Sequence, residues 1–432
     1  MAEQWYGNIE AHWQTGGNAN AVDNKDGNIG NVSIAGRLQG DIVLQNKVFM
    51  NSLTMSENGT ITGSVKVGEG GNDTQTPTLS TITLNGNSGI NAIVLGNSNG
   101  NGPRATINSL TLEGTSSIGT ITNNSNATIV NLTLNETGTI TNGITNDSNI
   151  GSLDLQNNTT YSGTGSITNA LDIANNKTLN ANTNGIKILF ANNATGTINN
   201  AGTILGSIDN QTSSTIKTFN TGSISGSIIN NADATIETLN VTSNVGSIAN
   251  SGDINSLTIQ SGSNIANGIT NNSNIGSLIV NENVSYSGSG SISNALEVAE
   301  GDTLTIGGNG TLNFDSDNGT INNAGTINGD INNNGTLTDF TNSGSISGTF
   351  TNEGHIVKFV NTDTGSINTF TNNNTISFFE NNGTITNFDG DGIIYGVINS
   401  KTITNGFENV ATSLWNKGKC FNYRQCCSKR RL

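Results

Sequence analysis

The chain has 432 residues, of which 32% are hydrophobic and 11% are charged, and its formal net charge is −15. Only ten Lys and Arg precede Lys417, so the sequence lacks the clustered cations that bind nucleic acid or an anionic membrane surface. No apolar run approaches the roughly 20 residues of a membrane-spanning helix. Good helix formers are too sparse for a helical period, and two Pro with a regular β-branched pattern argue against disorder.

Residues 1–26 are predicted to form an N-terminal cap. Trp5, Tyr6 and Trp13 crowd this segment, where aromatic side chains would cover the first coil of a stacked structure. A ligand-binding role for these aromatics is the alternative. No signal peptide is recognisable, because Glu3 and Glu10 interrupt the segment and no apolar core follows Met1. An exported protein would therefore need a leader that lies outside this sequence.

Residues 27–409 carry a short apolar repeat, with large residues at relative positions 0, 3 and 5. In one copy these are Ile107, Leu110 and Leu112. Positions 3 and 5 share a strand face, whereas position 0 points inward only if the backbone bends after it. The pattern predicts a corner followed by a short inward-facing strand. The other copies are Leu79, Ile82, Leu84; Ile129, Leu132, Leu134; Ile150, Leu153, Leu155; Ile236, Leu239, Val241; Ile254, Leu257, Ile259; and Ile275, Leu278, Val280.

A second signature, Gly followed by Ser or Thr and then Ile, alternates with the first, as at Gly119 and Gly246. Gly, Asn and Ser fill the segments between them and suit turns, because they tolerate left-handed backbone. We predict an all-β parallel β-helix with coils of about 18–22 residues, stacked about 4.8 Å apart. Ile and Leu should form internal ladders and Asn should form ladders at the corners. A leucine-rich repeat is the second-choice fold, since its LxxLxL spacing matches.

A long repeat lies over the short one, because residues 142–179 recur as 267–304 with an offset of 125. It places Tyr161 and Tyr286 at equivalent positions, where the rings either support a coil corner or stack on sugars. Further along, Ile-x-x-Phe recurs every nine residues, as at Phe370 and Phe379. Phe in place of Leu predicts a wider interior or a stack of Phe rings.

Catalytic chemistry finds little support in the sequence. A lyase or glycosidase on such a scaffold needs paired carboxylates with nearby cations or calcium. The candidate acids Asp315, Asp317, Asp389 and Asp391 fit solvated corners, and the spacing of a calcium loop is not met. His355 is expected to be an outward variant of a repeat position. We therefore predict no catalytic, cofactor-binding or metal-binding residues, and no enzyme.

Residues 410–432 form an atypical tail that contains all three cysteines, Cys420, Cys426 and Cys427, and six basic residues. The cysteines lack the CxxC pair of most zinc sites. We expect this tail to be non-native or disordered, with a basic nucleic-acid or membrane tail as the alternative. The body of the chain has no Cys, as is common in proteins that cross an oxidising periplasm.

The repeat patterns of residues 319–348 (GTINNAGTINGDINNNGTLTDFTNSGSISG) and 365–388 (GSINTFTNNNTISFFENNGTITNF) resemble those of the passenger domains of bacterial autotransporters. The resemblance is to the Asn/Thr/Gly-rich adhesins and vacuolating-cytotoxin-like proteins, and it covers residues 27–409. It implies a right-handed parallel β-helix that is secreted through its own C-terminal outer-membrane β-barrel. Neither that barrel nor the export signal is present here, so the chain is expected to be a fragment of the full-length protein.

The expected function is that of an adhesin or structural rod, which is displayed at the cell surface or secreted and binds through an extended lateral face. The expected partners are a host-cell or extracellular-matrix surface, glycans included, and further copies of the chain. No nucleic acid and no cofactor are expected. The alternative is a carbohydrate-active β-helix enzyme, which should gather charged residues on one coil.

Overall fold

The computed structural model describes residues 4–6, 9–11, 28–45, 47–68, 76–98, 104–181, 185–190, 196–307, 310–401, 403–406 and 411–412. Within these ranges every regular element is a β-strand and no helix occurs. The strands wind into a parallel β-solenoid of about 17 turns of roughly 21 residues. The predicted all-β solenoid is thus confirmed, and the leucine-rich alternative is wrong. The chain divides into two compact units, residues 1–227 and 228–432.

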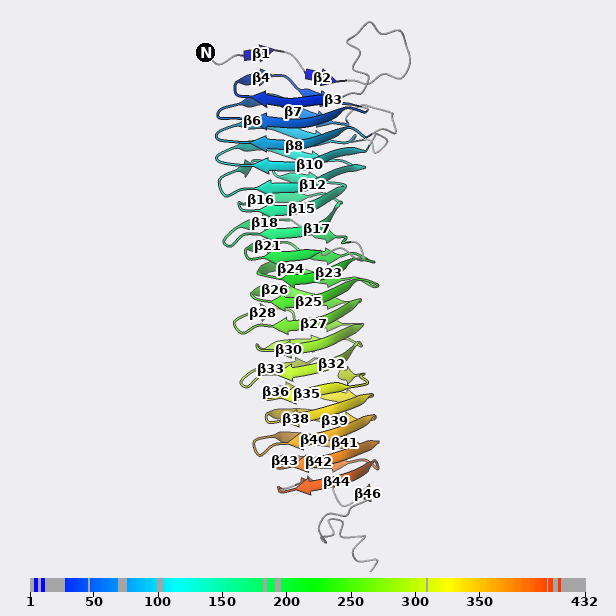
Figure 1. Cartoon of the computed structure of the whole chain (residues 1–432). Coiled ribbons are helices and arrows are strands. Elements are labelled where there is room, and N and C mark those ends of the chain that lie inside the picture. The colour runs from blue at the N-terminus through cyan, green and yellow to red at the C-terminus, as the bar shows by residue number, and fades with distance from the viewer. Residues whose placement is uncertain are drawn as a thin grey trace, which may run out of the picture. The chain divides into compact units, whose positions relative to one another are not determined.

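The strands that begin in the first unit are numbered in chain order, and Figure 1 labels many of them. They are β1 (Gln4–Tyr6), β2 (Ile9–Ala11), β3 (Asn28–Ile34), β4 (Arg37–Gln39), β5 (Ile42–Leu44), β6 (Phe49–Met55), β7 (Thr60–Val67), β8 (Thr78–Leu84), β9 (Gly89–Leu95), β10 (Ala105–Leu112), β11 (Ser117–Asn123), β12 (Ala127–Leu134), β13 (Thr139–Ile140), β14 (Ile144–Asn146), β15 (Asn149–Leu155), β16 (Thr159–Ser162), β17 (Ser166–Ile173), β18 (Thr178–Asn180), β19 (Ile186–Ile188), β20 (Thr197–Asn200), β21 (Thr203–Leu205), β22 (Ile208–Asn210), β23 (Thr215–Asn220) and β24 (Ser223–Asn230).

The strands that begin in the second unit follow the same labelling. They are β25 (Thr235–Val241), β26 (Asn244–Asn250), β27 (Asp253–Ile259), β28 (Asn264–Ile265), β29 (Ile269–Asn271), β30 (Asn274–Val280), β31 (Val284–Ser287), β32 (Ser291–Val298), β33 (Thr303–Ile306), β34 (Thr311–Phe314), β35 (Gly319–Asn323), β36 (Thr326–Asn328), β37 (Asp330–Asn333), β38 (Thr336–Asn342), β39 (Ser345–Asn352), β40 (His355–Asn361), β41 (Ser366–Asn372), β42 (Thr375–Asn381), β43 (Thr384–Asp389), β44 (Ile393–Asn399), β45 (Ile403–Asn405) and β46 (Ala411–Thr412).

The short apolar repeat is the core of each coil. In the first unit β10 pairs in parallel with β8 and β12, which places Leu110 opposite Ile82 and Leu132. Positions 0, 3 and 5 of all three strands are fully buried, while the two residues between positions 0 and 3 are exposed or half-buried. The backbone therefore bends after position 0, as predicted, and all three apolar side chains point inward.

Asn forms ladders as expected, but the longest ones lie inside the solenoid, whereas exposed Asn side chains among the described residues pair two at a time, as Asn87 does with Asn58. In the first unit Asn123 stands opposite Leu95 and Asn146, which is the inward position 5. Its Nδ2 donates to Asn146 Oδ1 at 2.7 Å. In the second unit the ladders are longer. They run Asn230, Asn250, Asn271; Asn323, Asn342, Asn361, Asn381, Asn399; and Asn333, Asn352, Asn372, each with amide-to-amide bonds of 2.7–2.8 Å.

The two repeated tyrosines end two of these ladders. Asn146 Nδ2 donates to Tyr161 Oη at 2.8 Å, and Asn271 Nδ2 donates to Tyr286 Oη at 2.9 Å. Both rings are 1% exposed, so the sugar-stacking alternative is wrong for them. Burial raises the pKa of Tyr161 to about 12, although the hydrogen bond from Asn146 opposes this shift. Burial also raises the pKa of Tyr286.

The phenylalanines near the C-terminal end of the second unit stack as predicted. Phe359 lies between Phe340 and Phe379, parallel to each within 5° and with ring centroids 4.7 Å apart. Phe350 and Phe370 form a second stack at 5.5 Å. The two stacks meet edge to face. One stack follows β38, β40 and β42, which pair with one another in turn, and the other follows β39 and β41. The nine-residue Ile-x-x-Phe repeat therefore corresponds to half a coil, and both halves of each coil carry the same Ile-x-x-Phe pattern.

Several sequence predictions fall outside the described residues. These include the side chains of the N-terminal cap and the tail with its three cysteines. The backbone of Trp5 and Tyr6 lies in β1, which pairs with β4. The capping role of these aromatics therefore stays a prediction.

Candidate functional site

The outer face of the last coils in the second unit differs from the Thr-, Ser- and Asn-rich surface around it. Strands β38, β40, β42 and β44 lie side by side in register and form this face, which we name the β38–β44 face. Phe340, Phe359 and Phe379 fill its inner side. Because the inner side is packed, the outer side chains are held at fixed positions one coil apart.

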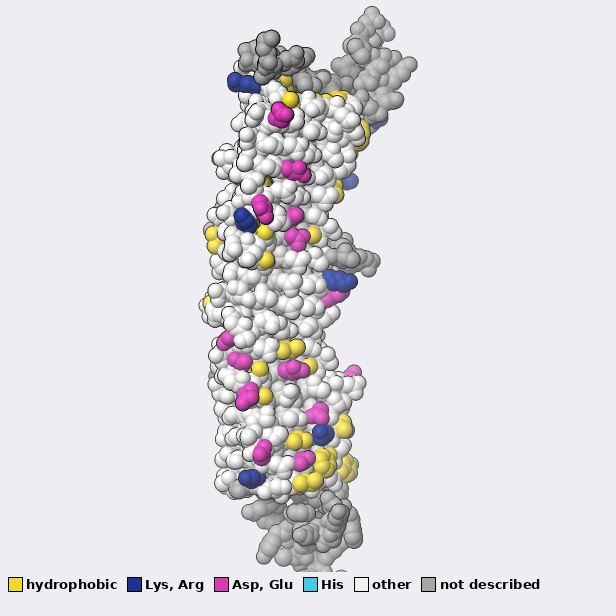
Figure 2. Space-filling model, turned by 60° about the vertical axis from the view of Figure 1, so that its left-hand side comes forward, with side chains coloured by type: hydrophobic (Ala, Val, Ile, Leu, Met, Phe, Trp, Pro, Cys, Tyr) yellow, Lys and Arg dark blue, Asp and Glu magenta, His cyan; other side chains and the backbone are white. Residues whose placement is uncertain are grey.

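The β38–β44 face carries an apolar patch that consists of Val357, Phe378, Ile393, Tyr395 and Ile398. Tyr395 is 55% exposed, and the three aliphatic residues are each exposed by 38–44%. Figure 2 shows hydrophobic side chains gathered near the C-terminal end of the described coils, on a surface that is otherwise mostly uncharged and polar. Exposed side chains of this size gain little by folding, so such a patch is a candidate contact surface.

A glycine on β44 makes room for the Phe378 ring of the patch. Phe378 stands opposite Gly396 in the register of β42 and β44. A Cβ on Gly396 would come within 3.3 Å of Phe378 Cδ2, so the ring reaches the backbone of the neighbouring strand. A larger residue at Gly396 would displace the ring.

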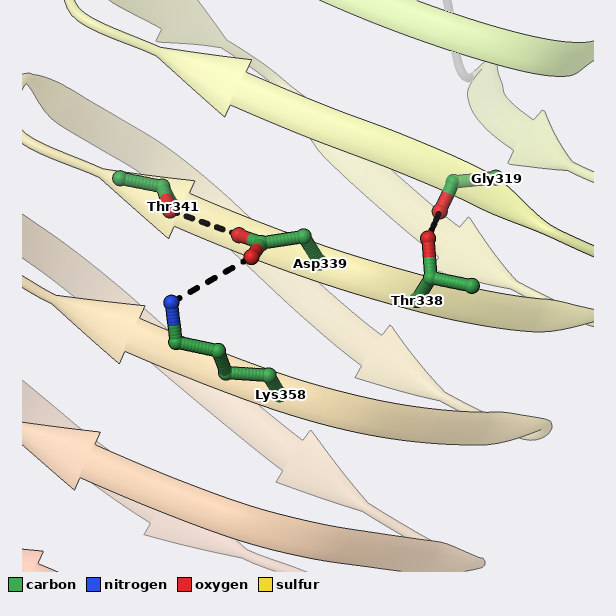
Figure 3. Close-up of polar contacts among 5 residues, drawn as sticks. All are labelled: Gly319, Thr338, Asp339, Thr341 and Lys358. Atoms are coloured by element: carbon green, nitrogen blue, oxygen red, sulfur yellow. Dashed lines mark hydrogen bonds and ion pairs between the residues drawn. The ribbon is translucent and has the colours of Figure 1, made fainter.

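Charged groups border the patch. Lys358 Nζ lies 3.4 Å from Asp339 Oδ2, and Thr341 Oγ1 donates to Asp339 Oδ1 at 2.8 Å. Figure 3 shows these contacts, together with the hydrogen bond from Thr338 Oγ1 to the carbonyl of Gly319. Both ion-pair side chains are about half exposed, so the pair contributes at most about 1 kcal/mol to folding. Its main effect is to orient Lys358, which stands opposite Phe378.

A shallow open groove of about 490 Å³ adjoins the patch, and we name it the Tyr395 groove. It crosses successive coils where the turns enter β38, β40 and β42. His355 Nε2 lies 2.8 Å from Ser377 Oγ. The lining residues are Asn334, Gly335, Thr336, Glu353, Gly354, His355, Asn374, Thr375, Ser377 and Tyr395.

The floor of this groove depends on close backbone contact between coils. A Cβ on Gly354 would lie 1.9 Å from the carbonyl oxygen of Gly335, so only glycine fits there. Beside it, Asn374 Nδ2 donates to the backbone carbonyl of Glu353, and Asn373 Nδ2 donates to Glu353 Oε1, both at 2.7 Å. These bonds fix a carboxylate and an amide at the rim.

The candidate acids lie in two places. Asp315 and Asp317 line a second shallow hollow of about 400 Å³, without a Lys or Arg in its lining. Asp315 Oδ1 accepts a hydrogen bond from Asn334 at 2.7 Å. Asp389 accepts one from the backbone N–H of Gly390, which is a turn contact, and Asp391 is exposed. Among the described residues, no three His, Cys, Asp or Glu group together as a metal site would require.

Sequence reasoning placed His355 correctly on the outside but missed the apolar patch. The available signal was the run Ile393-Ile394-Tyr395, which breaks the alternation of inward apolar and outward polar residues. In the structure Ile394 is buried, while its two neighbours are exposed.

Comparisons with protein families, with characterised proteins and with solved structures find no match to this chain. The structure itself defines the fold class of the protein, which is a parallel β-solenoid with internal ladders of Asn, Ile and Phe. Over the part of the chain that the structure describes, no helix is long and apolar enough to cross a membrane.

Proposed function

We propose that this chain is an adhesive or structural passenger of the autotransporter type, displayed on a cell surface or secreted, which binds other surfaces through its outer face. The β-solenoid fold supports this proposal, because each coil leaves most of its residues at least partly exposed and encloses only a narrow core. The described pockets are shallow and polar. Such a molecule is suited to contact over an area more than to chemistry in an enclosed site.

The observation that carries the proposal is the apolar patch on the β38–β44 face. Of the eight large hydrophobic side chains that are exposed among the described residues, four lie on this face. They are bordered by Asp339, Lys358 and Glu380, which resembles the apolar centre and polar rim of protein interfaces. The proposed partner is a host-cell or extracellular-matrix surface, as the resemblance to autotransporter adhesins implies. The same patch would also support self-association.

The alternative of a carbohydrate-active enzyme finds less support. A glycosidase needs two carboxyl groups on opposite sides of the scissile bond. Asp315 and Asp317 share a hollow, but they are two residues apart on one turn and no cation lines that hollow. We therefore propose binding without catalysis, and no cofactor.

The test is the binding of the purified chain to cultured animal cells and to immobilised matrix proteins. The variant Ile393→Thr/Tyr395→Ser/Ile398→Thr replaces patch residues by side chains of the kind that surround them, so the coil should still form. Binding should fall by at least about tenfold, since buried interface anchors each contribute 1 kcal/mol or more.

The matched control is Val130→Thr/Leu205→Thr, which removes two exposed apolar side chains from residues 1–227. It should bind as the unmodified chain does. Circular dichroism and thermal midpoints should be the same for all three proteins. Equal binding by the patch variant, or no binding by the unmodified chain to either surface, would contradict the proposal.

A further inference from the structure

We infer that the Tyr395 groove is a binding site for a neutral saccharide chain, which lies across the coils with one sugar ring on the face of Tyr395. This inference rests on the proposed adhesive function and names a ligand class and a site for it. Four properties of the groove carry it: its polar lining, its exposed aromatic ring, its spacing and its charge.

The polar lining suits hydroxyl groups. A sugar hydroxyl both donates and accepts, so it pairs best with a surface that offers donors and acceptors side by side. The groove supplies the Glu353 carboxylate, the amides of Asn334 and Asn374, and the hydroxyls of Thr375 and Ser377. The bonds that fix Glu353 and Asn374 leave their positions defined before a ligand arrives.

The aromatic ring supplies the apolar contact. One face of a pyranose ring carries C–H groups and is apolar, whereas its edge carries hydroxyls. Tyr395 is 55% exposed and lines the polar groove from β44. A ring with an apolar face and a polar tip is suited to such an amphipathic partner. Tyr161 and Tyr286 are buried and cannot serve in this way.

The spacing of the groove matches a chain of sugars. Thr336, His355 and Thr375 stand opposite one another on β38, β40 and β42, one coil apart at about 4.8 Å. This interval is close to the length of one unit in an extended polysaccharide. Successive sugars would therefore meet a polar side chain on each of these three coils. The groove is also open, so a long ligand can enter from the side.

The charge of the site restricts the ligand. Glu353 lines the groove and neither Lys nor Arg does, which disfavours sialylated or sulfated chains. An extended peptide is also disfavoured, because peptides commonly add to free strand edges. Here β40 and β42 are already paired on both sides, so a peptide would find no backbone partner.

The test is the binding of the labelled full chain to an array of immobilised oligosaccharides with neutral, sialylated and sulfated members. Neutral linear glycans should bind. Tyr395→Ala should weaken that binding by about tenfold or more, since it removes both the buried area and the stacking contact of the ring. Tyr395→Phe, which keeps the ring, should bind within about threefold of the unmodified chain. Glu353→Ala should weaken binding without changing the thermal midpoint.

The Val130→Thr/Leu205→Thr variant again serves as the control and should bind the array normally. The inference is overturned if array binding survives Tyr395→Ala, or if only charged glycans bind. It is also overturned, while the adhesive function stands, if the chain binds cells but no glycan and periodate treatment of the cells changes nothing. That last result would indicate that the binding partner on the cells is a protein and not a glycan. Failure to bind both cells and glycans would overturn the inference and the adhesive function together.

Discussion

Removing one amide from the middle of an Asn ladder should destabilise the second unit strongly. Asn361 is fully buried. Its Oδ1 accepts from Asn342 and its Nδ2 donates to Asn381 Oδ1, both at 2.8 Å. The same Nδ2 makes longer contacts with the carbonyls of Gly365 and Thr384, at 3.4 and 3.3 Å. The perturbation that we consider is Asn361→Ala.

The expected loss follows from these contacts. Two good hydrogen bonds contribute about 1 kcal/mol each, and a buried acceptor left without a donor costs about 1–3 kcal/mol more. Asn381 Oδ1 becomes such an acceptor. Asn342 Nδ2 keeps longer contacts with two backbone carbonyls and adds little. The free energy of unfolding should therefore fall by about 3–5 kcal/mol.

The assay is urea unfolding followed by far-ultraviolet circular dichroism, with hydrogen exchange of the β40 and β42 amides as a local measurement. The local measurement matters because stability in a stacked repeat depends mainly on neighbouring coils. The matched control is Asn368→Ala, at an exposed position of β41, which should change stability by less than about 0.5 kcal/mol. Similar losses for the two variants would refute the assignment of the amide ladder as a stabilising element.

Three further predictions concern the core. Leu132→Asp should unfold the neighbouring coils, because it buries an unpaired carboxylate; an unchanged thermal midpoint would show that Leu132 does not point inward. Phe359→Ala should cost about 3–5 kcal/mol, since it removes the ring between Phe340 and Phe379; urea titration measures this. Stability should fall as pH rises from 10 toward 12, because unfolded Tyr161 ionises at its usual pKa while the folded ring, with its pKa raised to about 12, stays neutral. This loss approaches about 2–3 kcal/mol, and Tyr161→Phe should abolish the contribution of this group to the alkaline loss in unfolding experiments.

The coil was predictable because its inward positions are large and aliphatic. The spacing of Leu110 and Leu112 shows which side chains of the strand point inward, and the spacing of Ile107 shows that the backbone bends before them. The Phe stacks followed from the same spacing. The buried amides were not predictable from composition, because Asn fills corners, outer rows and core alike. Their signal is positional: Asn342 follows Phe340 at the interval by which Leu112 follows Leu110.

The candidate site was harder to predict than the fold. Thr336, His355 and Thr375 come from three coils and meet only through the stacking register, which the sequence does not give to the residue. Tyr395 is separated from Glu353 by two coils of sequence, although both line one groove. A binding surface that crosses coils depends on how the coils are aligned with one another. The core depends only on which side chains of each strand point inward.

The open ends of the Asn ladders have an evolutionary consequence. Asn123, Asn323 and Asn333 each begin a ladder with an Oδ1 that has no hydrogen-bond donor among the described residues. Each faces an apolar residue of the preceding coil, namely Leu95, Val298 and Phe314. An exchange between Asn and an apolar side chain at such a boundary breaks or adds one amide pair, whereas the same exchange in the middle breaks two. Among sequences that descend from this gene, Asn should therefore be gained or lost mainly at the end of a ladder, one coil at a time. The Asn residues in the middle of a ladder should be the last to change.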